Sequence, residues 1–425
     1  MSGGVDSSVV AALLAEQGHE VIGATLQLYD HGAAVAKKGA CCAGQDIHDA
    51  RGVADRLGIP HYVLDREQVF RREVIADFAD SYARGETPIP CIRCNQGVKF
   101  RDLVALARDL GCEVLATGHY ARRIEGPEGP ELHRAADPVR DQSYFLAATT
   151  REQLAFARFP LGGFADKAAV RREAARLGLP VAEKADSQDI CFVPEGRYDA
   201  LVARLRPDTA EPGEVVHEDG RVLGAHGGIG RYTVGQGRGL GAASWDGGQR
   251  LYVAAVEPGR RRVVVAPREA LAARDAAAGE VNWLVAPPVA PLRCTVKLRA
   301  RETPRAACVA WDAAAGLLRI SLDEPGIVAP GQACVMYDGD RVLGGGFLRT
   351  TGPSHKDDRY DSIGAAESEL RHSGHSRLES ALTAQVSVVS TQMRFPCSAR
   401  GDRLTGCGPR PNSRPLIGWR RSSAG

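Results

Sequence analysis

The chain has 425 residues, of which 44% are hydrophobic and 25% are charged, with 54 Lys and Arg against 52 Asp and Glu. This length and apolar content exclude a disulfide-stapled miniature and a single small domain, and they predict two to three globular domains. The net charge of +2 is too small to bind nucleic acid by bulk charge, and residues 1–352 carry −2 while residues 353–425 carry +4. Any nucleic-acid site must therefore be a local patch, to which the 47 arginines can contribute bidentate phosphate contacts.

The sequence carries neither a run of 18 apolar residues nor a signal-peptide pattern at its start. We therefore expect a cytoplasmic protein without membrane association. In that reducing compartment the eleven cysteines are thiols by default, and most of them are expected to be packing residues.

Residues 1–200 alternate between short apolar runs and amphipathic stretches. In chain order, we expect a helix at 9–15, a strand at 20–28, a helix at 46–57, a strand at 61–64, helices at 67–83 and 95–110, and a strand at 113–117. This alternation predicts an α/β domain with a doubly wound parallel sheet, which binds ligands at the carboxyl ends of its strands. A phosphate loop should follow a strand, but the first strand is apparently missing before residue 2, unless another segment takes its place.

The character of the sequence changes after residue 200. Residues 201–278 are rich in glycine with short β-prone pieces, and predict a small β-rich central domain. Residues 279–352 repeat strand-length segments between Pro and Gly turns, which is typical of a small β-barrel. Residues 353–425 have few apolar runs, so we expect a disordered tail.

The chain opens on a string rich in glycine and serine, directly before an apolar helix. Adjacent glycines let consecutive backbone N–H groups approach a pyrophosphate, and the helix N-terminus adds partial positive charge. Asp6 could hold Mg²⁺ or cap the helix. A glycine-rich turn with an ordinary cap is the simpler alternative, and the absence of GxxxxGK[ST] excludes a Walker-type loop. The string resembles the PP-loop of ATP pyrophosphatases and consists of Ser2, Gly3, Gly4, Val5, Asp6, Ser7 and Ser8.

Three cysteines stand in polar surroundings. Cys91 and Cys94 lie in a proline-rich loop, and the following helix dipole with Arg93 and Lys99 should favour the thiolate of Cys94. Cys191 lies in a later polar loop. Two alternatives are buried packing thiols and a zinc site that also uses the pair at 41–42, although zinc lacks a second CxxC at suitable spacing.

Eight strings, in order over residues 1–350, resemble the bacterial tRNA-specific 2-thiouridylases, which replace the C2 oxygen of the wobble uridine with sulfur. They are MSGGVDSS, P-x-P-C-x-x-C-N-x-x-V-K-F, ATGHYAR at 116–122, DQSYFL at 141–146, DICF at 189–192, GAHGGIGRYTVGQGRGLG at 224–241, CTVK at 294–297 and PGQ at 330–332. The resemblance implies a PP-loop domain, a central β-rich domain and a C-terminal β-barrel. It also implies ATP and Mg²⁺ as cofactors, the anticodon arm of tRNA as substrate, and a persulfide-donating protein as partner.

The resemblance further assigns individual residues. Cys94 is implied to be the nucleophile and Cys191 the persulfide carrier, and the two thiols are implied to form a disulfide during the cycle. The implied adenosine contacts are the PP-loop, Leu26 and Gly118. The implied tRNA contacts are Ile89, Pro90, Cys91, His119, Arg140, Asp141, Gln142, Arg299, Ala300 and Gln332.

One position departs from the family pattern, because members often have Asp where this chain has Cys91. Its thiol is left with three possible roles, which are proton transfer, redox exchange and space filling. Two rival functions also remain at the level of sequence: another PP-loop adenylating ligase or amidating enzyme, and a catalytically inactive tRNA-binding protein.

Overall fold

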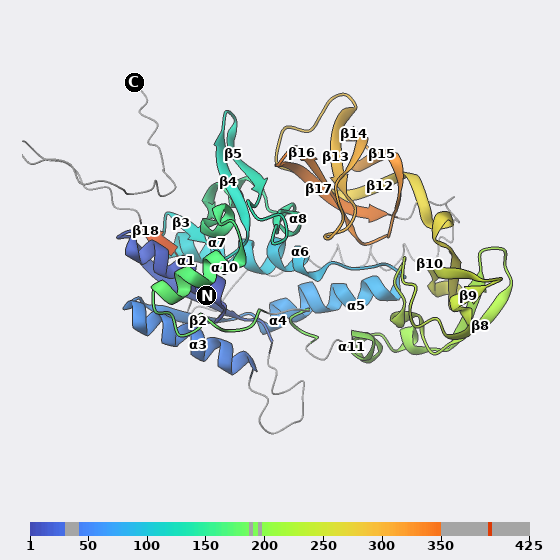
Figure 1. Ribbon diagram of the computed structural model, residues 1–425, viewed down its shortest axis with the longest axis horizontal. Helices are drawn as coiled ribbons and strands as arrows, with labels where there is room; N and C mark the ends of the chain where they lie inside the picture. The colour runs from blue at the N-terminus through green and yellow to red at the C-terminus, as the bar shows by residue number, and fades with distance from the viewer. Residues whose placement is uncertain (30–41, 187–189, 194–197, 350–389, 393–425) are drawn as a thin grey trace, which may run out of the picture. The chain divides into compact units, whose positions relative to one another are not determined.

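A five-stranded sheet organises the N-terminal domain (Figure 1). The computed structural model describes residues 1–29, 42–186, 190–193, 198–349 and 390–392. The strand order is β2-β1-β18-β3-β6, and β2 pairs parallel with β1 as β6 does with β3. The predicted α/β domain with parallel strands is confirmed. The strands are β1 (Glu20–Gln27), β2 (His61–Asp65), β3 (Val114–Ala116), β6 (Ala157–Arg158) and β18 (Ser390–Gln392).

Helix α1 (Val5–Glu16) is apolar on most of its surface and is therefore buried, with Val9, Val10 and Ala11 almost fully shielded from solvent. It shares one core with residues of α3, α7 and β3. The other helices of the domain are α3 (Cys42–Leu57), α4 (Glu67–Phe70), η1 (Arg71–Ile75), α5 (Ala76–Ala83), α6 (Pro90–Cys94), η2 (Asn95–Asp102), α7 (Leu103–Asp109), α8 (Ser143–Leu146), α9 (Arg151–Phe156) and α10 (Lys167–Arg176).

The helix expected at 95–110 begins earlier, at Pro90, and runs through α6 and η2 into α7. Proline suits the first position of a helix because its φ is already helical and its missing N–H has no partner there. The loop predicted around Cys91 and Cys94 is therefore wrong, since both cysteines lie on a helix. The segments η1 and η2 are π-helical, which the sequence did not predict.

A strand from residues 390–392 lies in the middle of the sheet. Strand β18 lies between β1 and β3 and pairs antiparallel with both. Within the predicted disordered tail, these three residues are therefore a strand, and the remaining residues of 353–425 lie outside the described ranges.

The central domain is a five-stranded sheet of order β8-β7-β11-β10-β9, preceded by α11 (Tyr198–Leu205). Leu251 and Val253, like Val263 and Val265, are fully buried at alternate positions of their strands, as one sheet face requires. The strands are β7 (Gly213–His217), β8 (Val222–His226), β9 (Trp245–Asp246), β10 (Gln249–Glu257) and β11 (Arg262–Pro267).

The C-terminal strands close into a barrel because β12 pairs with both β15 and β17. The predicted β-barrel is confirmed, although β12 starts at Ala272, inside the range assigned to the central domain. The strands are β12 (Ala272–Trp283), β13 (Leu292–Lys297), β14 (Arg305–Asp312), β15 (Leu317–Ile327), β16 (Ala333–Asp338) and β17 (Arg341–Arg349).

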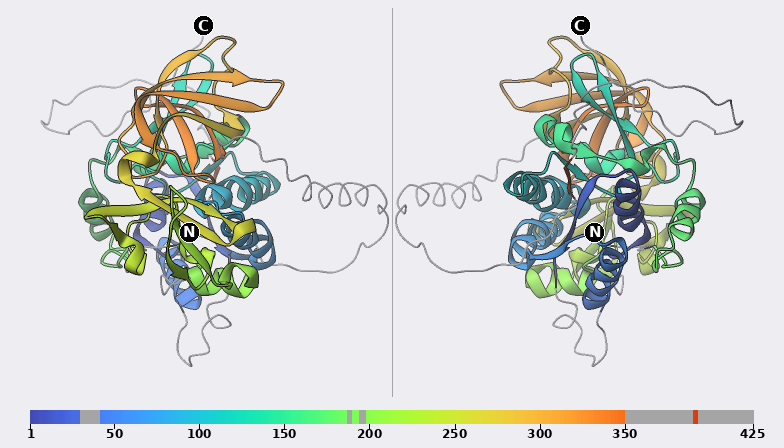
Figure 2. Two further views of the ribbon diagram at one scale, coloured as in Figure 1. Left: turned by 90° about the vertical axis from the view of Figure 1, so that its right-hand side faces the viewer. Right: turned by 90° about the vertical axis from the view of Figure 1, so that its left-hand side faces the viewer.

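The barrel packs on the N-terminal domain. The hairpin of β4 (Ala121–Gly126) and β5 (Gly129–Arg134) joins the barrel sheet where His133 pairs with Arg341 of β17 (Figure 2). The hydroxyl of Tyr144, on α8, donates to the carbonyl of Ala333 at 2.9 Å. Within the described ranges, no helix is long and apolar enough to cross a membrane.

Candidate functional site

Two glycines allow the backbone to close around the start of α1. Gly3 has a φ of +68°, and a Cβ at that position would overlap the carbonyl of Asp46 on α3. A Cβ on Gly118, just after β3, would lie 2.9 Å from the backbone nitrogen of Ser7. Such approaches require glycine. They place the PP-loop beside the carboxyl end of β3, where ligands of parallel sheets bind.

The start of α1 offers backbone amides to an anion. The N-cap residue is Gly4, which has no side chain to cap the first amides of the helix. The Ser2 N–H donates to Oγ of Ser7 at 2.9 Å, and Oγ of Ser8 donates to the Gly4 carbonyl at 2.8 Å. Because the first amides of a helix lack intrahelical partners, they bind phosphate readily. The loop is therefore a candidate site for phosphate groups.

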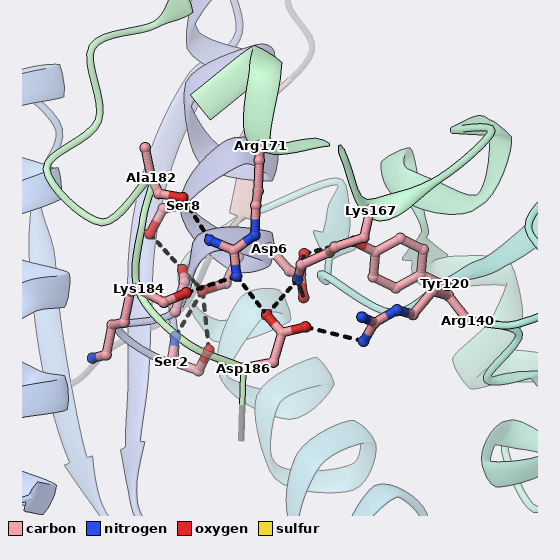
Figure 3. A network of polar contacts seen from close by, with 12 residues as sticks. Ser2, Asp6, Ser8, Tyr120, Arg140, Lys167, Arg171, Ala182, Lys184 and Asp186 are labelled. Carbon is pink, nitrogen blue, oxygen red and sulfur yellow. Dashed lines mark hydrogen bonds and ion pairs between the residues drawn. The ribbon is translucent and has the colours of Figure 1, made fainter. Parts of the chain in front are cut away.

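Asp6 does not cap α1, and its carboxylate is paired with two other side chains. Its carboxylate accepts a hydrogen bond from the Tyr120 hydroxyl at 2.7 Å and from Nζ of Lys167 at 2.7 and 2.8 Å (Figure 3). Within the described part of the chain, no three His, Cys, Asp or Glu side chains could together hold a metal ion. The described side chains therefore form no all-protein Mg²⁺ site. The cysteines at 41–42, on which the alternative zinc site depends, lie outside the described side chains.

Asp186 joins three cations beside the PP-loop (Figure 3). It pairs with Arg140 and Lys167 at 3.0 Å and with Arg171 at 3.2 Å. Burial opposes ionisation of this carboxyl, but the hydrogen bond and charge of Lys167, helped by the two arginines, hold its pKa below the ordinary value. Asp186 is therefore an anion that keeps Lys167 and Arg171 in place.

Lys184 ties the segment before Asp186 to the loop. Its Nζ donates to the Gly3 carbonyl at 3.0 Å and to the carboxylates of Asp46 at 2.7 Å and Asp49 at 2.5 Å. Arg171 donates to the carbonyls of Ala182 and Lys184 at 2.7 and 2.8 Å. The chain leading to Cys191 is therefore anchored to the PP-loop by charged contacts.

One cavity of about 550 Å³ runs from the PP-loop to the cysteines. This volume suits a nucleotide-sized ligand. The cavity wall includes Leu26 and Gly118, two of the implied adenosine contacts, and it also includes Cys91, Cys94 and Cys191. The structure thus brings the candidate phosphate loop and all three candidate thiols together in one cavity.

The thiols do not have the electrostatics that the sequence predicted. Cys94 is the last residue of α6 and continues into η2, so it lies inside a helix that begins at Pro90 and does not precede the helix as predicted. Burial raises its pKa, and the charge of Lys99 opposes that effect. Cys191 is exposed as a residue, yet the protein around its thiol removes enough water to raise the pKa to about 11. The prediction that its surroundings favour the Cys94 thiolate is therefore wrong.

Arg93 takes no part in activating Cys94. Its guanidinium donates to Glu280 of β12 at 2.7 and 3.2 Å, and it lies 3.9 Å from the ring centroid of Phe347 on β17. It connects the helix that carries Cys94 with the barrel. Lys99 is the cation that remains beside the thiols.

Several implied tRNA contacts lie around the cavity. His119, Arg140 and Gln142 line it, as do Pro90 and Cys91. Burial lowers the pKa of His119 to about 3, and Nδ1 of this neutral ring lies 2.9 Å from the hydroxyl of Thr117. Gln142 accepts a hydrogen bond from the Tyr120 N–H at 2.8 Å.

The other implied contacts do not line this cavity. Asp141 accepts hydrogen bonds from the N–H and hydroxyl of Ser143 and therefore stabilises a turn. Arg299 donates to the carbonyl of Val234 at 2.9 Å. Gln332 donates to the carbonyl of Thr87 at 3.0 Å. Ile89 is buried, and Ala300 packs against the core that the N-terminal domain shares with the barrel.

Sequence reasoning missed Lys167 and Lys184 as site residues, and assigned no role to Asp186. The signal that was available is the string KADSQDICF at 184–192, in which Lys184 and Asp186 stand a few residues before Cys191. Lys167 carried no such signal, because its partner Asp6 is 161 positions away in the chain.

Comparison with known proteins covers all three domains. The profile of the family described as tRNA methyl transferase HUP domain matches residues 1–195, the tRNA methyl transferase PRC-barrel domain matches 202–267, and the aminomethyltransferase beta-barrel domain matches 274–348. A curated relative from Acidiphilium cryptum, named tRNA-specific 2-thiouridylase MnmA, is 65% identical over 348 residues, which are 82% of this chain and 98% of the relative. Relatives of the same name from Gluconobacter oxydans and Rhodospirillum centenum are 60% and 62% identical, over 82% of this chain and 97% and 90% of their own lengths.

Proposed function

Since the chain belongs to the tRNA-specific 2-thiouridylase family, we propose that it is an ATP-dependent sulfurtransferase that converts the wobble uridine of tRNA to 2-thiouridine. The observation that carries the proposal is the single cavity that joins the PP-loop to Cys94 and Cys191. A reaction that needs both an adenylyl group and a sulfur nucleophile requires these two sites to be continuous.

The PP-loop and its anchors perform the first step. The amides at the start of α1 bind the phosphates, and ATP supplies the adenylyl group that turns the uracil C2 oxygen into a leaving group. Lys167 and Lys184 hold Asp6 and the Gly3 carbonyl in fixed positions, so the binding geometry is preorganised. Any Mg²⁺ in the reaction would enter with the phosphates of ATP, because no three of the described His, Cys, Asp and Glu side chains form a site that could hold it alone.

The thiols perform the second step. A persulfide on Cys191 carries the sulfur, and the thiolate of Cys94 attacks the inner sulfur of that persulfide. The S–S bond of the persulfide breaks, hydrosulfide leaves, and a disulfide joins Cys94 to Cys191. Hydrosulfide then attacks C2, and AMP leaves with the former C2 oxygen. Direct attack by the terminal sulfur is the alternative route, and both routes end in the same disulfide, which external thiols reduce.

Two partners belong to this proposal. The anticodon arm of tRNA is the substrate, and Arg140 and Gln142 at the cavity, with Arg299 and Gln332 on the barrel, are its proposed contacts. A persulfide-donating protein loads Cys191, whose exposure allows access from outside. The reduced thiols suit a cytoplasmic setting.

Nucleoside mass spectrometry of tRNA from cells that lack and then regain the gene tests the function. We expect 2-thiouridine to disappear and to return with the wild-type gene. Unchanged 2-thiouridine in both strains would refute the proposal. Thiolation that survives replacement of both Cys94 and Cys191 would instead support a different PP-loop chemistry.

A further inference from the structure

Cys94 and Lys99 both line the cavity, and the π-helical segment η2 explains how one side of the helix can carry both. The two lie five positions apart, and five positions of an α-helix advance about 1.4 turns, which would turn the side chains away from each other. A π-helix closes its hydrogen bonds between residues five apart, so positions i and i+5 approach one face. Such segments often occur at functional sites. Here the segment runs from Asn95 to Asp102, directly after Cys94.

Lys99 differs from the other cations of the cavity wall in its partners. Arg140 pairs with Asp186, and Lys184 pairs with Asp46 and Asp49. Within the described ranges, no carboxylate lies within ion-pair distance of Lys99, whose charge interacts instead with the thiols of Cys94, Cys91 and Cys191. An ammonium group without a carboxylate partner, in a cavity lined by thiols, is available to stabilise an anion formed there.

The neighbouring groups described below carry no positive charge that could stabilise such an anion, whereas Lys99 does. His119, which faces Lys99, is neutral, because burial and then the charge of Lys99 lower its pKa to about 3. Tyr29 hydrogen-bonds the Cys191 thiol and adds no charge. Burial raises the pKa of both Cys94 and Cys191, and for both thiols Lys99 is the leading opposing charge. Sulfur nucleophiles, however, react as anions.

We propose that Lys99 stabilises the anionic forms of the sulfur at this site, namely the thiolates of Cys94 and Cys191 and the persulfide anion carried by Cys191. The proposal rests on the proposed function for its place in the reaction, but the electrostatic effect exists in the free protein. Lys99 is a positioning residue, because it acts through the sulfur atoms rather than on the uracil.

Alkylation of the full-length protein by iodoacetamide, resolved by peptide mass spectrometry over a range of pH, tests the proposal without ATP or tRNA. In the Lys99→Met variant, we expect the alkylation profiles of Cys94 and Cys191 to move upward by about one pH unit, which is the lower end of the effect of a neighbouring charge. The alkylation rate at about pH 8 should fall about tenfold, because the thiolate fraction falls tenfold per pH unit. Lys99→Arg should keep the wild-type profile.

Lys297→Met is the matched control, because it removes another largely buried lysine, which lies on β13 over the ring of Tyr144 and away from the cavity wall. It should leave both profiles unchanged. Wild-type alkylation profiles in Lys99→Met and Lys99→Gln, both with wild-type melting temperatures, would overturn the proposal.

A second measurement separates sulfur chemistry from phosphate binding. We expect Lys99→Met to slow thiolation of tRNA and to leave ATP–pyrophosphate exchange intact. If exchange and thiolation fall by the same factor while alkylation is unaffected, Lys99 holds ATP and the proposal is wrong. A failure of the proposed function would look different, since the alkylation profiles would still shift while no tRNA is thiolated.

Discussion

The close approach of Gly118 to the PP-loop predicts that Gly118→Ala weakens ATP binding. The added methyl group would lie 2.9 Å from the nitrogen of Ser7 and 3.0 and 3.1 Å from Cβ and C of Asp6, so the loop backbone must move away. Overpacking of this kind costs about 1–3 kcal/mol. If all of this free energy opposes binding, the Kd for ATP rises about 5-fold to 150-fold.

Isothermal titration with ATP and the KM for ATP in pyrophosphate exchange measure this effect. Gly52→Ala is the control, because Gly52 lies within α3 and its new methyl group would meet no atom within 4 Å. That variant should gain about 0.5–1 kcal/mol of stability, since alanine is the better helix former, and should bind ATP as the wild type does. Wild-type ATP affinity in Gly118→Ala, at an unchanged melting temperature, would refute the argument that the PP-loop requires this close approach.

Three further predictions concern the thiols, the barrel contact and a buried histidine. Cys94→Ser and Cys191→Ser should each abolish tRNA thiolation. Pyrophosphate release from ATP should survive in Cys191→Ser, and loss of that release would contradict separate roles for the PP-loop and the thiols. A double-mutant cycle of Arg93→Ala and Glu280→Ala, measured by urea unfolding, should give a coupling free energy of about 1 kcal/mol or less. The reason is that the Glu280 side chain is 46% exposed, so water screens the ion pair. A coupling far above that value would show that the contact is desolvated. The folded-state pKa of His119, about 3, lies below its ordinary 6.5, so only the unfolded state takes up this proton as the pH falls below 6.5, and stability should decline. Between about pH 7 and about pH 5.5 the loss should be about 1 kcal/mol, and a His119→Gln variant with the same pH dependence as the wild type would argue against it.

The sequence predicted those parts of the fold that follow from the pattern of apolar residues and turns along the chain. The parallel sheet was predictable because apolar runs and amphipathic stretches alternate with glycine at the joints. The barrel was predictable because strand-length segments recur between turns. The start of α6 was missed because Pro90 can either interrupt a helix or begin one, and the sequence alone does not decide between these roles.

The candidate site was predictable only where its residues are neighbours in the sequence. The PP-loop and the Cys91-x-x-Cys94 pair are short strings, and the residue types in each string indicate its chemistry. The contact between Asp6 and Lys167 brings together residues 161 positions apart, and no periodicity reports such a pair. The π-helical geometry that aligns Lys99 with Cys94 likewise has no signature in residue type, because it depends on how the whole helix packs.

The small net charge of the chain does not show which of its cations can contact RNA, because that depends on the partners of each cation. Arg140 shares Asp186 with Lys167 and Arg171, and its own side chain is 41% exposed against 19% for Asp186. If a tRNA phosphate draws Arg140 away, Asp186 keeps two cations and no buried charge is left unpaired, so the exchange is inexpensive. Arg171 and Lys167 cannot leave in this way, because their other contacts hold the PP-loop and the chain before Cys191. Cations at the cavity therefore differ in their availability to RNA, and a count of charges does not reveal that difference.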